Sequence, residues 1–135
     1  MASFRELVSD MGRQLGMDNL APDEHGVCEI VSEEADIVVM DCTEAGGNVL
    51  VAAKVADAPQ DEIAACKAAL EANKSLSGGS GATVSMDADD GSFFIALYRP
   101  LDSLDGNKMV ALMERFASEL LSVREVLAKS APERR

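Results

Sequence analysis

Three cysteines and one histidine are the side chains in this sequence with the greatest potential for nucleophilic or metal chemistry. Cys28, Cys42 and Cys66 form an odd set without C-x-x-C spacing, and each lies in an apolar or helical segment. His25, the single histidine, lies in an acidic turn. A structural zinc site needs several Cys or His ligands, and a cysteine nucleophile needs a nearby base. We therefore expect reduced thiols in the core, no catalytic residue, no metal site and no cofactor.

Two short motifs match ligand-binding loops only in part. Asp87, Asp89, Asp90 and Gly91 offer the carboxylates of a calcium loop, but its sixth-position glycine and distant bidentate glutamate are missing. This segment therefore predicts a tight turn. The glycine-rich segment 78–81 lacks the Lys-Ser or Lys-Thr pair of a phosphate loop. The alternative from another functional class is an enzyme whose carboxylates act as acid–base pairs or magnesium ligands. We predict that the protein is not an enzyme.

The charge balance argues against polyanionic partners. The 135 residues include 12 Lys and Arg against 24 Asp and Glu, a formal net charge of −12. No Lys or Arg lies between Arg13 and Lys54, where nine Asp and Glu occur. Nucleic acid is bound by clustered cations, so neither nucleic acid nor anionic lipid is an expected partner. The acidity could equally serve solubility alone.

The location of the protein is predicted from its apolar tracts. The N-terminus has no basic stretch followed by an apolar run, and tracts such as Ile37 to Met40 are far too short to span a bilayer. We expect a cytoplasmic protein without membrane insertion. Its length fits a single domain over 1–135, with 130–135 as a disordered tail.

The first half of the chain predicts a helix followed by three strands. Ser3 and Glu6 form a capping-box pattern, and apolar residues then recur at helical spacing up to Gly16. β-branched runs predict strands over 27–31, 36–42 and 49–55, with a hairpin loop over 44–48. These strands should form an antiparallel meander.

The second half predicts helix, two strands, helix. Pro59 suits the first turn of a helix that ends near Lys74, and segment 77–81 should be a flexible connector. Strands follow over 82–86 and 92–99, and a helix of about six turns runs from near Asp105 to near Lys129. The predicted class is α+β, in the order α-β-β-β-α-β-β-α, with a mainly antiparallel twisted sheet packed against helices.

This order of elements, in a short acidic chain, resembles the effector chaperones of bacterial type III secretion, the Tir-chaperone family. The resemblance covers nearly the whole sequence and depends on the order and spacing of several loose motifs. They are Phe4 to Val8 with Leu15 to Met17, Gly26 to Ile30, Leu70 to Asn73, Gly81 to Met86, Phe94 to Leu97 with Pro100 to Asp102, and a long amphipathic closing helix. One departure is the glycine-rich segment 78–81, which leaves the position of the fourth strand at the subunit interface open.

The resemblance implies a homodimer that binds the N-terminal segment of a secreted effector protein. The chaperone would keep that segment partly unfolded, soluble and secretion-competent, as virulence-associated chaperones do, and would deliver it to the secretion ATPase. An alternative on the same fold is a regulatory or structural adaptor that binds a folded protein partner. The sequence does not separate these two functions.

The regularly spaced apolar residues of the sequence provide more apolar surface than three helices and five short strands can bury. This excess favours a partner-binding surface. Met11 and Met40 are assigned to that surface, and Met86 and Met113 to the core. The predicted partner-binding residues are Phe4, Leu7, Val8, Met11, Leu15, Val38 and Met40. The predicted dimer-interface residues are Ile63, Cys66, Leu70, Phe94, Ala96 and Tyr98. The alternative for the stripe on the first helix is that its side chains belong to the core.

Overall fold

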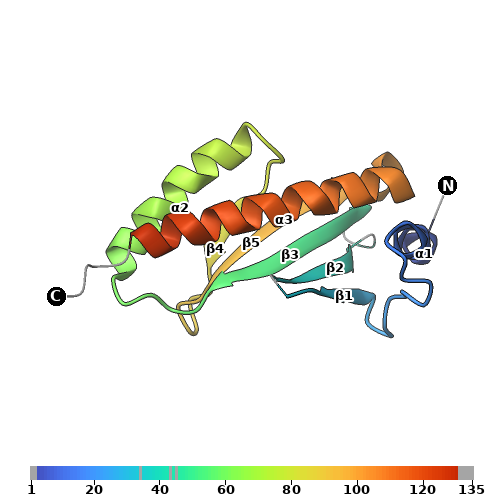
Figure 1. The fold of residues 1–135 in the computed structure, drawn as a ribbon, viewed down its shortest axis with the longest axis horizontal. Coiled ribbons are helices and arrows are strands. Elements are labelled where there is room, and N and C mark those ends of the chain that lie inside the picture. The colour runs from blue at the N-terminus through green and yellow to red at the C-terminus, as the bar shows by residue number, and fades with distance from the viewer. Residues whose placement is uncertain (1–2, 34, 43, 45, 131–135) are drawn as a thin grey trace. The chain divides into compact units, whose positions relative to one another are not determined.

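The computed structural model describes residues 3–33, 35–42, 44 and 46–130. Within these residues, three α-helices and a five-stranded antiparallel sheet confirm the predicted α+β class and element order (Figure 1). The elements are α1 (Phe4–Gln14), β1 (Val27–Val31), β2 (Asp36–Cys42), β3 (Asn48–Ala56), α2 (Glu62–Ser77), β4 (Thr83–Met86), β5 (Phe93–Pro100), a 3₁₀ turn η2 (Leu101–Ser103) and α3 (Gly106–Lys129). The described part of the predicted tail is Ser130, and residues 131–135 lie outside the described residues.

The sheet has the strand order β1-β2-β3-β5-β4, so β1 and β4 are its edges. The antiparallel register of the first pair sets Cys28 opposite Val39, and that of the last pair sets Val84 opposite Ile95. These four side chains are buried. Because successive side chains point to opposite faces of a strand, the alternate residues form a second, more exposed face on each pair.

By its packing the chain divides into two compact units. The boundaries fall after Val51 in β3, after Leu97 in β5 and after Arg115 in α3. Unit 1 holds α1, β1, β2 and the first part of α3, and unit 2 holds α2, β4, most of β5 and the rest of α3. The prediction of a single domain stays a prediction.

In unit 1, two glycines allow close packing around α1. The helix is capped by Ser3, whose hydroxyl accepts a hydrogen bond from the Glu6 N–H at 3.2 Å. A Cβ at Gly12 would lie 2.6 Å from the Met17 carbonyl oxygen, and one at Gly106 would lie 2.9 Å from the Cβ of Asp10. The chain after α1 and the start of α3 can therefore approach α1 only because these positions carry no side chain.

In unit 2, α3 anchors the glycine-rich segment. The backbone N–H of Ser80 donates to the Glu119 carboxylate at 3.3 Å, and the Ser80 hydroxyl donates to the same group. Gly79 and Gly81 both donate to the Leu76 carbonyl at 2.9 Å. Ser80 is buried. The segment predicted as a flexible connector is thus fixed, because a carboxylate 39 residues away holds it.

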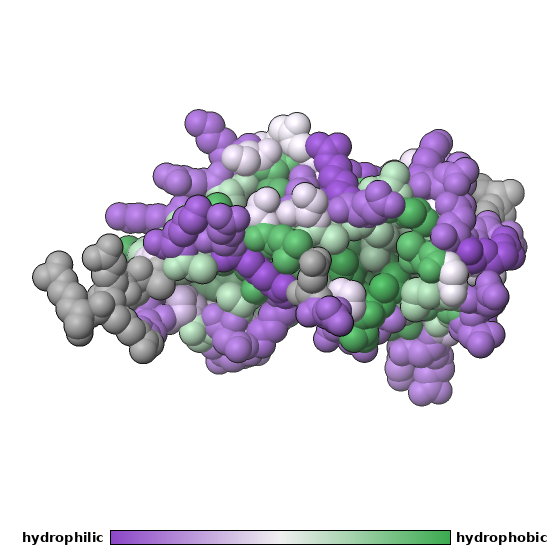
Figure 2. Space-filling model, in the orientation of Figure 1, coloured by the Kyte–Doolittle hydropathy of each residue, from purple (hydrophilic) through white to green (hydrophobic). Residues whose placement is uncertain are grey.

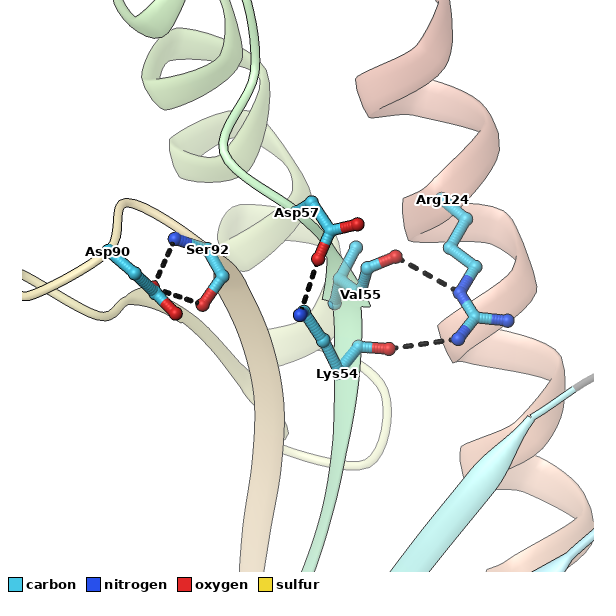
Figure 3. A network of polar contacts seen from close by, with 6 residues as sticks. All are labelled: Lys54, Val55, Asp57, Asp90, Ser92 and Arg124. Carbon is cyan, nitrogen blue, oxygen red and sulfur yellow. Dashed lines mark hydrogen bonds and ion pairs between the residues drawn. The ribbon is translucent and has the colours of Figure 1, made fainter.

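Arg124 connects α3 to the end of β3 (Figure 3). Its Nε donates to the Val55 carbonyl at 3.1 Å and its Nη2 to the Lys54 carbonyl at 2.9 Å. The Lys54 ammonium also pairs with Asp57, and this contact raises the pKa of Lys54. One side chain of α3 therefore satisfies two strand carbonyls that would otherwise need other donors.

In the turn between β4 and β5, the acidic side chains accept hydrogen bonds from residues of the turn itself. Asp90 accepts hydrogen bonds from the Ser92 N–H at 2.8 Å and from the Ser92 hydroxyl at 2.6 Å (Figure 3). Asp87 accepts from the Asp89 N–H at 2.9 Å. These bonds support the predicted tight turn, since the acidic side chains stabilise the backbone of the turn itself.

The boundaries of α2 differ from those predicted. The helix begins at Glu62, because the Asp61 carboxylate accepts from the Ala64 N–H at 3.0 Å and caps it, and it continues to Ser77. The buried face of α2 is made of small side chains: Ala65, Ala68, Ala69, Ala72 and Leu76. Its larger apolar side chains consequently lie on the other face.

Candidate partner-binding surfaces

Helix α1 carries four of the predicted partner-binding residues, all of them buried in this chain, and a fifth, Leu15, follows the helix as its C-cap. Val8 and Met11 are 0% exposed, Leu7 is 1% exposed and Phe4 is 6% exposed, whereas Leu15, just after the helix, is 40% exposed. Phe4, Leu7, Val8 and Met11 are therefore buried as the alternative assignment of this stripe to the core expects. Only Leu15 is positioned to contact a partner without movement of the helix.

The outer face of the β1–β2 pair holds the other two predicted residues. Val38 and Met40 are half-buried there, and Met40 lies opposite Val27 in the register. Val31, on the same face, is 64% exposed. Figure 2, which views the molecule from the side where α3 is drawn in front of the strands, shows hydrophobic surface among hydrophilic side chains. The exposed Glu29 and Asp36 lie on this face as well, so the structure leaves a partly apolar face along the first edge of the sheet.

The outer edge of β1 has unused backbone groups. The Asp41 N–H donates to the Gly26 carbonyl at 2.8 Å, so alternate residues from Gly26 face β2 and the residues between them face outward. At Val27 the outward groups are taken by Asp23, through its backbone N–H at 2.8 Å and its carboxylate at 3.0 Å. The outward groups of Glu29 and Val31 have no hydrogen bond to another residue of the described chain.

The opposite edge, β4, is closed by a side chain. The Asn73 carboxamide oxygen accepts from the Val84 N–H at 2.6 Å, and its nitrogen donates to the Val84 carbonyl at 3.1 Å. Helix α2 therefore gives β4 the pair of hydrogen bonds that a further strand would supply. This residue was part of the sequence motif but was not assigned a role, because its partner lies 11 residues away in another element.

The predicted dimer-interface residues of α2 lie on its exposed face. Ile63 is 71% exposed, Leu70 is 70% exposed and Cys66 is half-buried. A cavity of about 280 Å³ beside them is lined by Cys66, Ala69, Leu70, Asn73, Val84, Ser85, Met86 and Phe93. Met86 is 40% exposed, so its assignment to the core was wrong, whereas Met113 is buried as expected.

The remaining predicted interface residues share one face of β5. Phe94 and Ala96 are half-buried and Tyr98 is 58% exposed, whereas the residues between them are buried. In the register Phe94 lies opposite Ser85, which is exposed. The outer face of β5 is thus apolar and only partly covered.

The structure gives no sign of an activated thiol at Cys28. Burial raises the pKa of this thiol, and the negative charge of Asp23 adds to the effect. A raised pKa keeps sulfur protonated at neutral pH and lowers its reactivity. Among the described residues, no group of three or more His, Cys, Asp or Glu side chains lies close enough together to hold a metal ion. None of the helices in this described part of the chain is long and apolar enough to cross a membrane.

The sequence matches one protein-family profile, that of the Tir chaperone protein (CesT) family, over residues 6–124. A comparison with curated proteins gives no match. The family match runs from the first turn of α1 to most of α3, and so includes the residues of the surfaces described above except Phe4.

Three solved structures illustrate the similarity of fold. The HopA1–SchA chaperone–effector complex gives a TM-score of 0.69 at 20% identity, covering 88% of this chain and 91% of that chain. The Yersinia pestis type III secretion chaperone SycH, bound to a stable fragment of YscM2, gives 0.69 at 12% identity, covering 90% and 99%. The heterodimeric ExoU–SpcU complex from the type III secretion system of Pseudomonas aeruginosa gives 0.67 at 13% identity, covering 89% and 96%.

Proposed function

The chain belongs to the Tir chaperone protein (CesT) family, and from this premise we propose that it is a type III secretion chaperone for an effector protein. In this role it binds the N-terminal segment of the effector as a homodimer, keeps it partly unfolded and soluble, and presents it to the secretion ATPase. It works in the cytoplasm and catalyses no reaction itself.

The open edge of β1 is the observation that carries this proposal. An extended peptide can add to a sheet edge through backbone hydrogen bonds, while pockets for its side chains select its sequence. The outward groups of Glu29 and Val31 offer such hydrogen bonds, and Val38 and Met40 lie on the partly apolar face beside them. An unfolded segment has free backbone groups to pair there, whereas a folded domain has few.

The similar structures support a protein partner. One is a chaperone–effector complex, one holds a chaperone with a fragment of another protein, and one is a heterodimer from a type III secretion system. For this chain we propose Leu15, Val38 and Met40 as direct contacts. Phe4, Leu7, Val8 and Met11 would hold α1 in place beside the bound segment.

The homodimer is proposed on the exposed face of α2. Leu70 and Ile63 expose most of their apolar surface, and large exposed apolar side chains next to an apolar cavity are typical of an interface. We propose that this face, together with the outer face of β5, is covered by a second copy of the chain.

The adaptor function remains the second candidate, and mapping the bound region separates the two. The tagged protein would be purified from its own cells, treated with protease while bound, and the protected partner fragment identified by mass spectrometry. A protected N-terminal segment of a secreted protein supports the chaperone. A protected folded domain supports the adaptor.

Two substitutions at one position test the edge itself. Val31→Pro removes an outward-facing N–H that the fold does not use, so the protein should still fold. It should weaken binding of the mapped segment by at least about tenfold. Val31→Ala, the matched control, shortens the side chain but keeps the N–H and should bind within about threefold of the original protein. Equal binding by both variants would remove the β1 edge from the proposal.

A further inference from the structure

A cationic pocket in unit 1 stands out against the acidic chain. Its volume is about 330 Å³, and it is lined by Arg99, Ser103, Leu104, Lys108, Ala111, Leu112 and Arg115. Three of the 12 Lys and Arg in a chain of net charge −12 thus meet around one cavity, and no acidic side chain lines it. The cations come from the end of β5 and from one face of α3, where Lys108 and Arg115 are two turns apart.

The positive charge of Lys108 lies near the N-terminal end of α3, where the helix dipole disfavours it. The Asp105 carboxylate accepts from the Lys108 N–H at 2.8 Å and caps α3, so Lys108 lies in the first turn. The N-terminal end of a helix favours acidic side chains, and a glutamate at this position would complete a capping box. A lysine here therefore disfavours the helix slightly while contributing charge to the pocket.

The pocket combines its charges with an apolar wall. Leu104 and Leu112 are half-buried and present part of their surface to the cavity. A bare inorganic anion would leave that wall in contact with water. The ligand that fits both features has carboxylates for the cations and an apolar side chain for the leucines.

The surroundings restrict the length of such a ligand. Asp102, Asp105 and Glu114 are exposed and lie between the cations of the pocket in the sequence. A long polyanion such as nucleic acid would meet these carboxylates on leaving the pocket and be repelled. These carboxylates therefore favour a ligand with few charges over a long polyanion, because the repulsion grows with the number of anionic groups that pass them.

We propose that this pocket binds a short acidic and apolar segment of a partner protein, through Arg99, Lys108 and Arg115. Arg99 donates to the Tyr98 carbonyl at 3.0 Å, and Arg99 and Arg115 each make a further polar contact in the described chain. A guanidinium has five N–H donors, so each arginine can bind a carboxylate as well. The net negative charge of the chain repels acidic peptides in general. Binding of such a peptide would therefore indicate that this pocket holds it. The pocket can act whether or not the proposed secretion function is correct.

The test uses a fluorescent peptide of about eight residues made of Glu and Leu, with a matched peptide in which every Glu is Gln. Binding is followed by fluorescence anisotropy. The protein should bind the Glu peptide and bind the Gln peptide at least about tenfold more weakly. No binding of the Glu peptide, or equal binding of both peptides, would overturn the proposal.

The variant pair localises the site. Lys108→Glu with Arg115→Glu should weaken Glu-peptide binding at least about tenfold. Arg5→Glu with Lys129→Glu, on exposed positions of α1 and α3 outside the pocket lining, changes net charge equally and should stay within about twofold. Equal loss in both would assign binding to overall charge and refute the pocket.

Two further measurements complete the test. Lys108→Glu alone should raise the thermal midpoint, so that a loss of binding in this variant is not caused by unfolding. An oligonucleotide that displaces the peptide at equal charge, or a pocket variant that sediments as a smaller species than the original protein, would assign the site to nucleic acid or to a second copy. Either result would overturn the peptide proposal.

Discussion

The amide of Asn73 bonds both backbone groups of Val84, as a neighbouring strand would. We expect Asn73→Ala to destabilise the protein by about 1–3 kcal/mol, because two partly buried backbone groups lose their partners. Asn73→Asp should also destabilise it, since the carboxylate still accepts from the Val84 N–H but sets its second oxygen against the Val84 carbonyl. Urea unfolding measures both. Asn107→Ala, at an exposed site of α3, is the control, and an equal loss in that variant would contradict the role of Asn73.

At the residue scale, the lowered pKa values of two carboxyl groups predict how the stability of the protein depends on pH. Hydrogen bonds from the backbone N–H groups of Val27 and His25 lower the pKa of Asp23, and the Ser92 hydroxyl and N–H lower that of Asp90. A lowered folded-state pKa stabilises the protein above the unfolded-state pKa. That stabilisation is lost as pH falls through the folded-state value. Both groups are at the surface, so the effect should be small.

Unfolding midpoints in urea at about pH 7 and about pH 3 check this. Asp23→Asn with Asp90→Asn should lose less stability on acidification than the original protein. A variant with the same charge change at Asp18 and Asp102 separates these hydrogen bonds from net charge. If the two double variants behave alike, the lowered pKa values do not contribute to acid sensitivity.

At the scale of elements, α1 contributes more to the core than to the surface. Val8→Asp or Met11→Asp would place a charge at a site with no exposure, and each should cost more than about 4 kcal/mol and unfold the protein. Leu15→Asp, at a site 40% exposed, should leave it folded. Circular dichroism with urea titration measures all three. If the Met11→Asp protein folds but no longer binds the partner, the buried apolar stripe of α1 is part of the binding site and this prediction is wrong.

The sequence predicted the elements well, because each depends on local periodicity. The stripe of α1 and the alternation in the strands are visible without tertiary contacts. The contacts made by Asn73, Glu119 and Arg124 could not be predicted, since their partners lie 11, 39 and 69 residues away. Met86 was misplaced for the same reason. Alternation indicates which residues share a face, but not whether an element covers that face.

At the scale of the whole molecule, the exposed face of α2 predicts self-association. Sedimentation should give about twice the 14.3 kDa mass of one chain at micromolar concentration. Leu70→Asp should shift the protein towards the single chain, because it puts an uncompensated charge into the proposed interface. Leu121→Asp, at another exposed leucine in unit 2, should leave the mass unchanged. A single-chain mass for the original protein would contradict the homodimer.

The unequal edges of the sheet also limit growth. In the terms of polymer chemistry, a sheet with two free edges is a bifunctional monomer, since each added molecule creates a new end for the next. Here β4 spans four residues, and one of its two outward positions is bonded to Asn73, whereas Glu29 and Val31 on β1 are unoccupied. The β4 edge therefore offers a further strand far less than the β1 edge does. A single extended segment that joins the β1 edge covers the more open end, and edge-to-edge growth through this sheet is disfavoured.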